Sequence, residues 1–474
     1  MKKLSIYIIA IGFLFGCTDD LKDATDFTAV ENQNLPESAI VGLTNSSSIW
    51  KDGIDRDLSI TLNEILILAE LGSDNYVNTQ TFFSQFLDGL TIRVDDPDIR
   101  DTQFRIARLR EAAKFGLETV GPNDSAYTTD TEAEYNFFEG MSYLFAGMYF
   151  SHLAQEELGT TFSSTENLTK AIASFDIAIG LNPKAEYYLA KARANYYLGN
   201  KADAVEAANN ALGIQSDFLR PAKYDQENGP VNIMDNALFQ RASFDDLQPL
   251  PTLDFLDPKY SFLEENVDQS VNYLKAEEAY FILAEAALSD GNLSGAQDHL
   301  RDLLSLVNNR EVRTFSDQIE GRTQRDPGSR PDKATVVVNG RSGLVLDRQS
   351  GEISVPSISG TSLTLDEING LTAADDDALE LLYRTRQEVF IGEGLRFADM
   401  GVKLVIHENE ILQNPNISDG DPGTTPVIPS FISAIIADLD GFTYDADAGT
   451  ATTTINLNEV LVSNKTDDAV LPFH

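Results

Sequence analysis

The sequence predicts a mainly α-helical protein in which helical hairpins form a scaffold that carries large irregular loop insertions and a small β-hairpin. Three observations support this prediction. Long segments place apolar residues at helical spacing, a pattern of small residues recurs three times, and stretches rich in Pro, Gly and Asp separate these regions. With 474 residues, 42% of them hydrophobic, the chain is long enough to bury a large core.

Helices are expected in three segments before the repeats and in one segment after them. Residues 58–71 are almost continuously apolar, residues 100–119 place apolar side chains roughly on one side, and residues 132–158 are rich in aromatic residues. Residues 378–412 form the last helical segment. These helices supply most of the predicted core.

The repeated pattern begins at Ala171, with the spacing A-x3-F-x2-A-x4-P. A second copy places Ala204 33 residues further on, and a third surrounds Tyr280. Small residues let paired helices approach closely, which is the basis of the tetratricopeptide (TPR) hairpin with its period of about 34 residues. A generic Ala-rich helix pair is the alternative for any single copy. TPR-like hairpins are therefore expected at about 132–213 and 271–307, with an insertion between them.

The insertions have a different composition from the helical segments. Residues 214–270 include prolines at positions 249, 251 and 258, which exclude one continuous helix. Three valines at 336–338 precede Asn339-Gly340, which predicts a β-hairpin with a tight turn. The tail from 413 onward is rich in Asp, Gly, Pro and Thr, so loops and short elements are expected there.

The N-terminal segment predicts export. Lys2 and Lys3 precede an apolar run that is too short to span a bilayer, and Cys17, the only cysteine, follows directly. Residues 1–16 therefore resemble a bacterial lipoprotein signal peptide, with Cys17 as the lipidated first residue of the mature chain. The alternatives are an ordinary signal peptide with a chance cysteine, or a buried free thiol.

An acidic tether is expected at 17–34, before a single domain over 35–474. Asp19 and Asp20 resemble the surface-export signal of Bacteroidetes lipoproteins, and a simple solvated tether explains them equally well. The charge of the whole chain is also acidic, with 75 Asp and Glu against 35 Lys and Arg, a formal net charge of −40. Such a field repels phosphate backbones, so no nucleic-acid partner is expected.

The sequence shows no specific motif of catalysis or of metal binding. The four histidines are widely separated, Gly392 and Gly394 lack the third glycine of a dinucleotide loop, and no nucleophile elbow is present. We therefore predict that the protein is not an enzyme and has no cofactor. Calcium remains open, because the acidic loops at 419–423 and 444–449 lack the EF-hand pattern but carry oxygen ligands.

Two motifs, together with the lipoprotein signal and the TPR-like hairpins, carry a resemblance to a known family. The early motif consists of Glu70, Ser73 and Asp74. The late motif, R-x-E-x4-E-G-x-R-x2-D, consists of Arg386, Glu388, Glu393, Gly394, Arg396 and Asp399. In this order the features resemble the SusD/RagB family, outer-membrane nutrient-binding lipoproteins of Bacteroidetes, over nearly the whole mature chain.

The late motif is interpreted as a buried polar junction and not as a catalytic pair. Gly394 allows the chain to turn after a helix end, and Arg396 is expected to pair with Asp399 or Glu393. The early residues Glu70 and Asp74 are expected to be structural as well.

The resemblance implies a function and a location. Family members are non-catalytic, face outward on a lipid anchor in the outer membrane, and deliver a glycan or sometimes a peptide to a SusC-like TonB-dependent transporter. Aromatic rings that stack on sugars are expected among Trp50, Tyr76, Phe82 and Phe83, with burial in the core as the alternative.

Three other functions remain open at this point. They are peptide or protein capture by the same fold, a surface glycosidase that uses a carboxylate pair, and a TPR scaffold without a small ligand. A further expectation concerns polyanionic glycans, which the net charge disfavours unless a local basic patch or calcium compensates. Five arginines form a candidate patch or, equally, a solvated loop: Arg322, Arg325, Arg330, Arg341 and Arg348.

Overall fold

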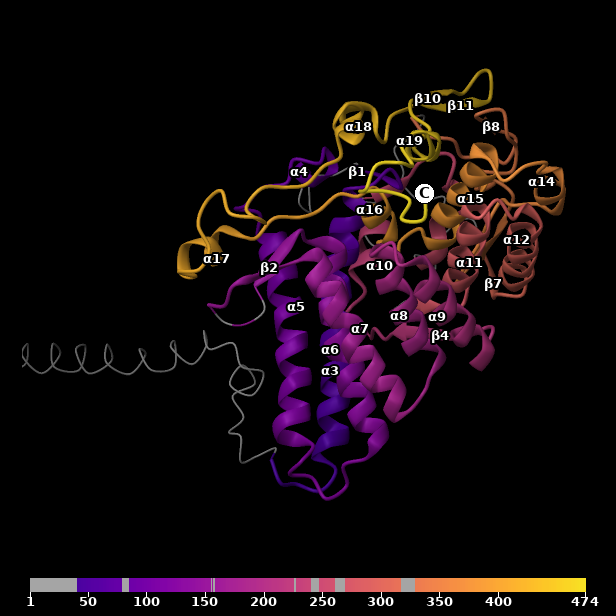
Figure 1. Cartoon of the computed structure of the whole chain (residues 1–474). Helices are drawn as coiled ribbons and strands as arrows, with labels where there is room; N and C mark the ends of the chain where they lie inside the picture. The colour runs from indigo at the N-terminus through magenta and orange to yellow at the C-terminus, as the bar shows by residue number, and fades with distance from the viewer. Residues whose placement is uncertain are drawn as a thin grey trace, which may run out of the picture.

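Helices dominate the chain, as the sequence predicts (Figure 1). The computed structural model describes residues 41–78, 85–154, 156, 158–225, 227–239, 247–260, 269–316 and 329–474. The signal peptide at 1–16, Cys17 and the tether at 17–34 lie outside the described residues, so the predictions made for them stay predictions.

The α-helices of the first half of the chain are α3 (Ser46–Leu71), α4 (Gln85–Asp88), α5 (Pro97–Phe115), α6 (Thr129–Tyr149), α7 (Ser164–Leu181), α8 (Ala185–Tyr197), α9 (Lys201–Ile214) and α10 (Ile233–Phe239). Those of the second half are α11 (Glu277–Ser289), α12 (Leu293–Asn308), α14 (Leu365–Gly370), α15 (Asp376–Phe390), α16 (Leu395–Asp399), α17 (Glu408–Gln413), α18 (Ser430–Ser433) and α19 (Leu457–Ser463). Shorter helical turns are η3 (Gly116–Val120), η4 (Asp254–Tyr260) and η5 (Ile436–Asp438).

The long helices α3, α5, α6 and α7 run side by side at one end of the molecule (Figure 1). Local signals set where they begin: Asp96 caps α5 by accepting from the Asp98 N–H, and Thr128 caps α6 by accepting from the Thr131 N–H. Helix α6 ends at Tyr149, so the prediction of a helix to residue 158 is wrong. The chain turns extended at Phe150.

The TPR-like pattern corresponds to closely packed helix pairs. Helix α6 packs on α7, α8 on α9, and α11 on α12. A Cβ added at Gly140 of α6 would lie 2.5 Å from the Phe175 ring of α7, so only glycine permits this approach. The alanines at 204, 208 and 211 of α9 are fully buried. Small residues thus bring the helices together, as the repeat predicts.

The strands are short and form separate small sheets. They are β1 (Tyr76–Asn78), β2 (His152–Ala154), β3 (Thr161–Ser163), β4 (Leu219–Ala222), β5 (Leu247–Pro249), β6 (Val271–Lys275), β7 (Val312–Ser316), β8 (Val337–Val338), β9 (Glu352–Pro356), β10 (Phe442–Asp445) and β11 (Thr450–Thr453). The antiparallel pairs are β1–β5, β2–β3, β4–β6, β7–β9 and β10–β11, and β8 joins β11 in parallel.

The predicted hairpin at 336–340 is right about the turn and wrong about the pairing. Asn339 and Gly340 both have positive φ, 49° and 79°, as a tight hairpin turn requires. Only a single bridge, between Val338 and Arg341, closes the turn, because β8 takes its main partner from β11, more than 100 residues later. The C-terminal tail supplies that partner.

The last predicted helical segment is broken into three helices. Helix α15 ends at Phe390, and Gly392, Gly394 and Gly401 follow with φ of 74° or 75°, a left-handed conformation that interrupts a helix. The short helix α16 fits between these glycines. Within the described part of the chain, no helix has both the length and the hydropathy needed to cross a membrane.

Candidate functional site

The early and late sequence motifs meet in the folded chain. The Arg396 guanidinium of α16 binds Asp74, which follows α3, through two hydrogen bonds: Nε to Oδ1 at 2.6 Å and Nη2 to Oδ2 at 2.9 Å. Arg386 of α15 binds Asp399 in the same way, at 2.7 and 3.1 Å. All four side chains are at most 7% exposed, so these are buried, charge-assisted pairs.

Two further motif carboxylates are also buried. Glu70 accepts a hydrogen bond from the Gly394 N–H at 2.7 Å and one from the Asn75 amide at 2.8 Å, and burial raises the pKa of Glu70 to about 7. Glu393 lies between two buried lysines, Lys259 and Lys275, with the Lys275 Nζ 2.7 Å from its Oε1.

These contacts correct the predicted pairing of the late motif. Arg396 was expected to bind Asp399 or Glu393, but it binds Asp74, Arg386 takes Asp399, and Glu393 takes the two lysines. The partners of Arg396 and Glu393 lie far from the late motif in the sequence, and spacing within the motif does not reveal them. The structural interpretation of the motif agrees with its burial.

A closed ring of hydrogen bonds connects this buried junction to a pocket. Gln387 donates to Asp74 at 3.0 Å, Asn458 of α19 donates to Gln387 at 2.9 Å, and Arg396 donates to Asn458 at 2.8 Å and to Asp74. Each of these four residues is at most 8% exposed. The ring holds three chain segments together, and Asp74, Gln387 and Asn458 also line the pocket.

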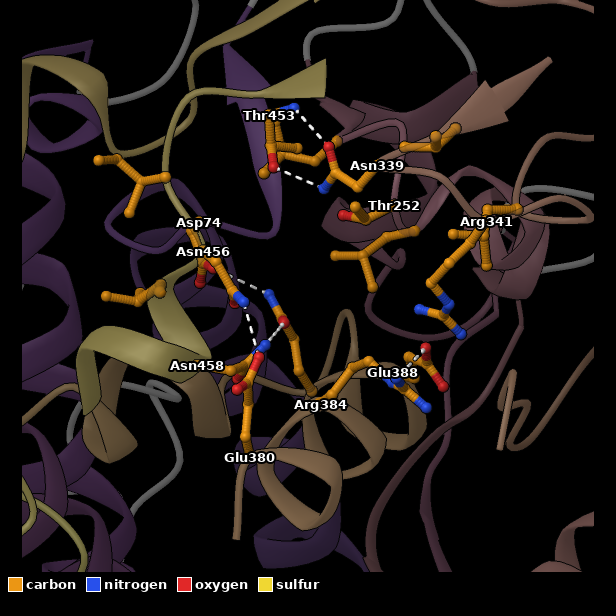
Figure 2. A pocket seen from close by; sticks show the side chains of 17 residues that line it. Asp74, Thr252, Asn339, Arg341, Glu380, Arg384, Glu388, Thr453, Asn456 and Asn458 are labelled. Atoms are coloured by element: carbon orange, nitrogen blue, oxygen red, sulfur yellow. Dashed lines mark hydrogen bonds and ion pairs between the residues drawn. The ribbon is translucent and has the colours of Figure 1, made fainter. Parts of the chain in front are cut away.

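The pocket encloses about 210 Å³ where α15, the turn after β8, the residues after β5 and the β11–α19 segment meet (Figure 2). Eleven polar or charged side chains and six apolar ones line it. The polar ones are Asp74, Thr252, Asn339, Arg341, Glu380, Arg384, Gln387, Glu388, Thr453, Asn456 and Asn458, and the apolar ones are Leu250, Leu253, Val338, Leu344, Ile455 and Leu457.

Helix α15 supplies one wall of the pocket. Glu380, Arg384, Gln387 and Glu388 are four, three and one residues apart, a spacing that places them on one helix face. Helix α15 also packs on α11, and its pocket-facing side meets the α19 segment, where Asn458 donates to Gln387. The helix therefore presents two carboxylates, an amide and a guanidinium to one small cavity.

Apart from Asp74, the other walls come from the second half of the chain. Asn339 of the tight turn exchanges hydrogen bonds with Thr453 of β11, at 2.8 and 3.1 Å, and Asn456 donates to Glu380 at 2.7 Å. Figure 2 shows these side chains gathered around the cavity opposite α15. Amides, hydroxyls and carboxylates in this arrangement can read the hydroxyl groups of a polar ligand by hydrogen bonding.

The structure places two of the predicted ligand-binding aromatics in the core. Trp50 is 7% exposed, its ring packs 5.3 Å from that of Phe115, and its Nε1 donates to the Ala112 carbonyl. Tyr76 is 1% exposed in β1, opposite Pro249. Neither ring offers a face to a sugar, so the prediction of stacking platforms is corrected for these two. Phe82 and Phe83 lie outside the described residues.

The candidate arginine patch is also corrected. Arg348 is buried and binds Asp254 and Asp257 at 2.8 and 3.1 Å, and Arg330 is buried with its Nη1 2.8 Å from the Pro249 carbonyl. Arg341 alone of the described arginines of this set lines the pocket. Arg322 and Arg325 lie outside the described residues. Within the same described ranges, no group of three or more His, Cys, Asp and Glu side chains is arranged to hold a metal.

Most of the pocket residues were missed by sequence reasoning. One signal was available on α15: Glu380, Arg384 and Gln387 form a polar stripe on a helix whose remaining residues are largely apolar and buried. Asn456 and Asn458 carried no signal, because they lie in a tail whose packing only the fold determines.

Comparisons with known proteins agree with the resemblance in the sequence. No protein-family sequence model matches the chain, and no curated protein matches it in sequence. Solved structures do match it. A Bacteroides vulgatus protein to which sugar binding is attributed shares 12% identity, with 81% of this chain and 100% of that chain covered and a TM-score of 0.54.

Two further solved structures have the same arrangement. A SusD-like protein of Bacteroides fragilis shares 12% identity, over 78% of this chain and 88% of that one, with a TM-score of 0.51. A SusD superfamily protein of Bacteroides thetaiotaomicron shares 11% identity, over 84% and 94%, also with a TM-score of 0.51. The likeness lies in the fold, since few residues are shared. The chain has the SusD-like fold, a helical TPR-like scaffold with irregular insertions.

Proposed function

We propose that this protein is a surface-exposed, non-catalytic glycan-binding lipoprotein that delivers its ligand to a SusC-like TonB-dependent transporter. The observation that carries the binding function is the polar pocket between α15 and α19, on a fold shared with a protein to which sugar binding is attributed. Its amides, hydroxyls, carboxylates and guanidinium groups match the donors and acceptors that a saccharide presents.

The lining favours recognition by hydrogen bonds over recognition by stacking. Among the described lining residues none is aromatic, and the six apolar ones are aliphatic. Leu250, Leu253 and Leu457 can contact the C–H surface of a sugar ring, and the polar side chains can bind its hydroxyl edge. The cavity volume of about 210 Å³ is below the usual range of ~300–1,000 Å³ for drug-sized ligands, so one sugar ring fits better than an extended chain segment.

The pocket carboxylates support binding over catalysis. Asp74 is held by Arg396 and Gln387, Glu380 accepts from Asn456, and Glu388 accepts from Thr361 and Ser362. A glycosidase would require one carboxylic acid free to donate its proton and a second free to attack or to activate water. Here the carboxylates are engaged with donors of the protein itself.

Affinity electrophoresis of the purified full-length protein through gels containing different polysaccharides tests the binding function. We expect at least one polysaccharide to retard the wild type. Glu380→Ala removes a hydrogen-bond acceptor from the pocket and leaves a residue that suits a helix. The affinity that the retardation reports should fall about tenfold, as expected for the loss of one hydrogen bond to a charged group. Asp377→Ala is the matched control, because Asp377 is exposed one turn earlier on the same helix.

Three results would contradict this proposal. The first is that no polysaccharide retards the protein while a peptide mixture binds, which would favour peptide capture. The second is equal retardation of wild type and Glu380→Ala. The third is turnover of a retarded polysaccharide that an amide substitution of Glu380 or Glu388 abolishes, which would favour a glycosidase.

The lipid anchor and the transporter partner need tests of their own, because only the sequence supports these two parts of the proposal. Cys17→Ala should release the protein from the membrane and leave its affinity for polysaccharide unchanged. Protease treatment of intact cells should degrade the wild type if it faces the exterior. Purification through the native lipid anchor should recover a TonB-dependent transporter barrel, and recovery of none would contradict the delivery role.

A further inference from the structure

Two arginines face each other across one end of the pocket. Arg341 follows the tight turn of Asn339 and Gly340, and Arg384 projects from the middle of α15. Figure 2 shows both side chains converging at the end of the cavity that also holds Glu388, away from Asn456 and Asn458. Two like charges are thus held close together in a protein of formal net charge −40.

The arginines are only partly matched by protein acceptors. Arg384 binds Glu367 through Nη2 at 2.7 Å, but its Nε is buried and has no hydrogen-bond partner among the described residues. The nearest carboxylate oxygen to that Nε is Oε1 of Glu388 at 3.9 Å, which is too far for a hydrogen bond. Arg341 donates through Nη2 to the Ser362 hydroxyl, a neutral acceptor.

Glu388 lies beside the two arginines, but its oxygens accept hydrogen bonds from neutral donors and from neither guanidinium. The Thr361 hydroxyl and the Ser362 N–H each donate to Oε2 at 2.7 Å, and the Ser362 hydroxyl donates to Oε1. The carboxylate is therefore committed to the 361–362 backbone and side chains. Apart from the bonds to Glu367 and Ser362, neither guanidinium has a hydrogen bond to a described residue, so each keeps further donors for a ligand.

The remaining charges of the pocket are arranged away from this end. Asp74 is paired with Arg396, and Glu380 is bound to Asn456 on the α19 side. Burial, and after it the neighbouring Arg384 charge, lower the pKa of Arg341, while Glu388 and Glu367 act in the opposite direction. An incoming anion would relieve the repulsion between the two guanidinium groups.

We propose that the Arg341–Arg384 end of the pocket binds the carboxylate of an acidic sugar, so that the ligand is a glycan containing uronic acid. A planar carboxylate with two oxygens fits the donor fork of a guanidinium better than a neutral hydroxyl does. The sugar hydroxyls then face the amides and Glu380 at the other end. This inference rests on the proposed glycan-binding function and names the class of ligand for the same pocket.

Calorimetric titration of the purified full-length protein tests the inference with matched ligands. Oligosaccharides of galacturonate, glucuronate and mannuronate are each compared with their carboxyl-reduced counterparts, which keep the ring and lose the charge. We expect one acidic oligosaccharide to bind about 10- to 100-fold more tightly than its reduced form, the effect of losing a charge-assisted hydrogen-bond pair. The difference should shrink as sodium chloride is raised.

Variants of the two arginines test whether these side chains cause the preference for the acidic oligosaccharide. Arg341→Met and Arg384→Met should each lower the affinity for the acidic ligand about 10-fold or more and leave that for its reduced form nearly unchanged. Arg384→Lys keeps the positive charge and loses the two-donor fork of the guanidinium group. It should therefore bind the acidic ligand more tightly than Arg384→Met and less tightly than the wild type. Arg301→Met is the control, because Arg301 lies on α12 outside the pocket, partly exposed, and binds Asp298 and Asn369. Thermal melts confirm that every variant is folded.

The outcomes separate this inference from the proposed function. If neutral oligosaccharides bind as tightly as acidic ones, or if both Met variants keep the preference for the acidic form, the inference is wrong and glycan binding stands. Preference for a sulfated neutral sugar over every uronate would also overturn it. If no saccharide of any kind binds, the proposed function itself fails.

Discussion

Asp74 and Arg396 form a buried ion pair across 322 residues of sequence, with two hydrogen bonds of 2.6 and 2.9 Å. Their side chains are 7% and 3% exposed. The pair joins the end of α3 to α16, and Gln387 and Asn458 complete the ring around it. The same aspartate reaches the pocket, so the geometry of the candidate site depends on this long-range contact.

Breaking this pair should destabilise the protein strongly. Arg396→Met leaves Asp74 as an uncompensated buried carboxylate, and the expected loss in free energy of unfolding is about 3–5 kcal/mol. Urea denaturation followed by circular dichroism measures this loss.

Arg100→Met is the matched control, because Arg100 pairs with Asp101 on the surface, where the expected loss is at most about 1 kcal/mol. The double variant Asp74→Asn with Arg396→Met should lose less than the two single losses combined. Equal losses for Arg396→Met and Arg100→Met would contradict the buried-pair argument.

Gly394→Ala should be more costly than the same change at Gly291. Both glycines have positive φ, 75° and 72°, so an alanine at either position is strained by about 1–2 kcal/mol in this left-handed conformation. At Gly394 the new Cβ would also lie 3.0 Å from the Leu66 side chain, whereas at Gly291 it would meet open space. Thermal melts of the two variants give the comparison. Indistinguishable melting temperatures would show that the close packing at Gly394 has no energetic consequence.

Glu285→Gln should remove a pH dependence from the stability. Glu285 accepts from the Tyr196 and Tyr383 hydroxyls, and burial raises its pKa from 4.5 to about 7. The folded state therefore holds the proton more tightly than the unfolded state, and the wild type loses stability as pH rises from about 4.5 to 7. Glutamine stays neutral, so relative to the wild type the variant should gain about 3 kcal/mol between pH 4 and pH 8.

Urea midpoints of the Glu285→Gln variant and the wild type at several pH values measure this gain. Glu206 is exposed on α9, so Glu206→Gln controls for the loss of one negative charge. A difference between variant and wild type that is constant with pH would exclude a proton held by Glu285 in the folded state.

The fluorescence of Trp50 should report unfolding and not ligand binding. Trp50 is the single tryptophan of the chain and lies in the core against Phe115, outside the pocket lining. Its emission should move to longer wavelength on denaturation, because water then reaches the ring. A saturating saccharide should leave the emission of the folded protein unchanged. Strong quenching by a bound saccharide would show that Trp50 contacts the ligand after all.

Local patterns accounted for much of the fold. Apolar periodicity placed helices at 58–71, 100–119 and the start of 132–158, and the spacing of small residues indicated which helices pair. The Asn339-Gly340 turn and the break near Gly394 also followed from local backbone preferences. These features depend on neighbours within a few residues, which the sequence shows directly.

The candidate site depended on contacts that the sequence does not show. Whether Arg396 binds Asp399, Glu393 or Asp74 is decided by which helices meet, and spacing within the late motif pointed only to Asp399 and Glu393. Trp50 and Tyr76 could not be assigned to surface or core, because an aromatic ring suits both a sugar platform and an apolar core.

The sequence by itself determined a helical scaffold of TPR-like hairpins, an acidic chain and the two polar motifs. Tertiary structure alone decided that residues 74, 341, 384 and 458 surround one cavity, since they come from four separate segments. The physical reason is that side-chain packing and buried charge pairing are optimised over the whole fold, so a site built from distant segments exists only after the helices have packed.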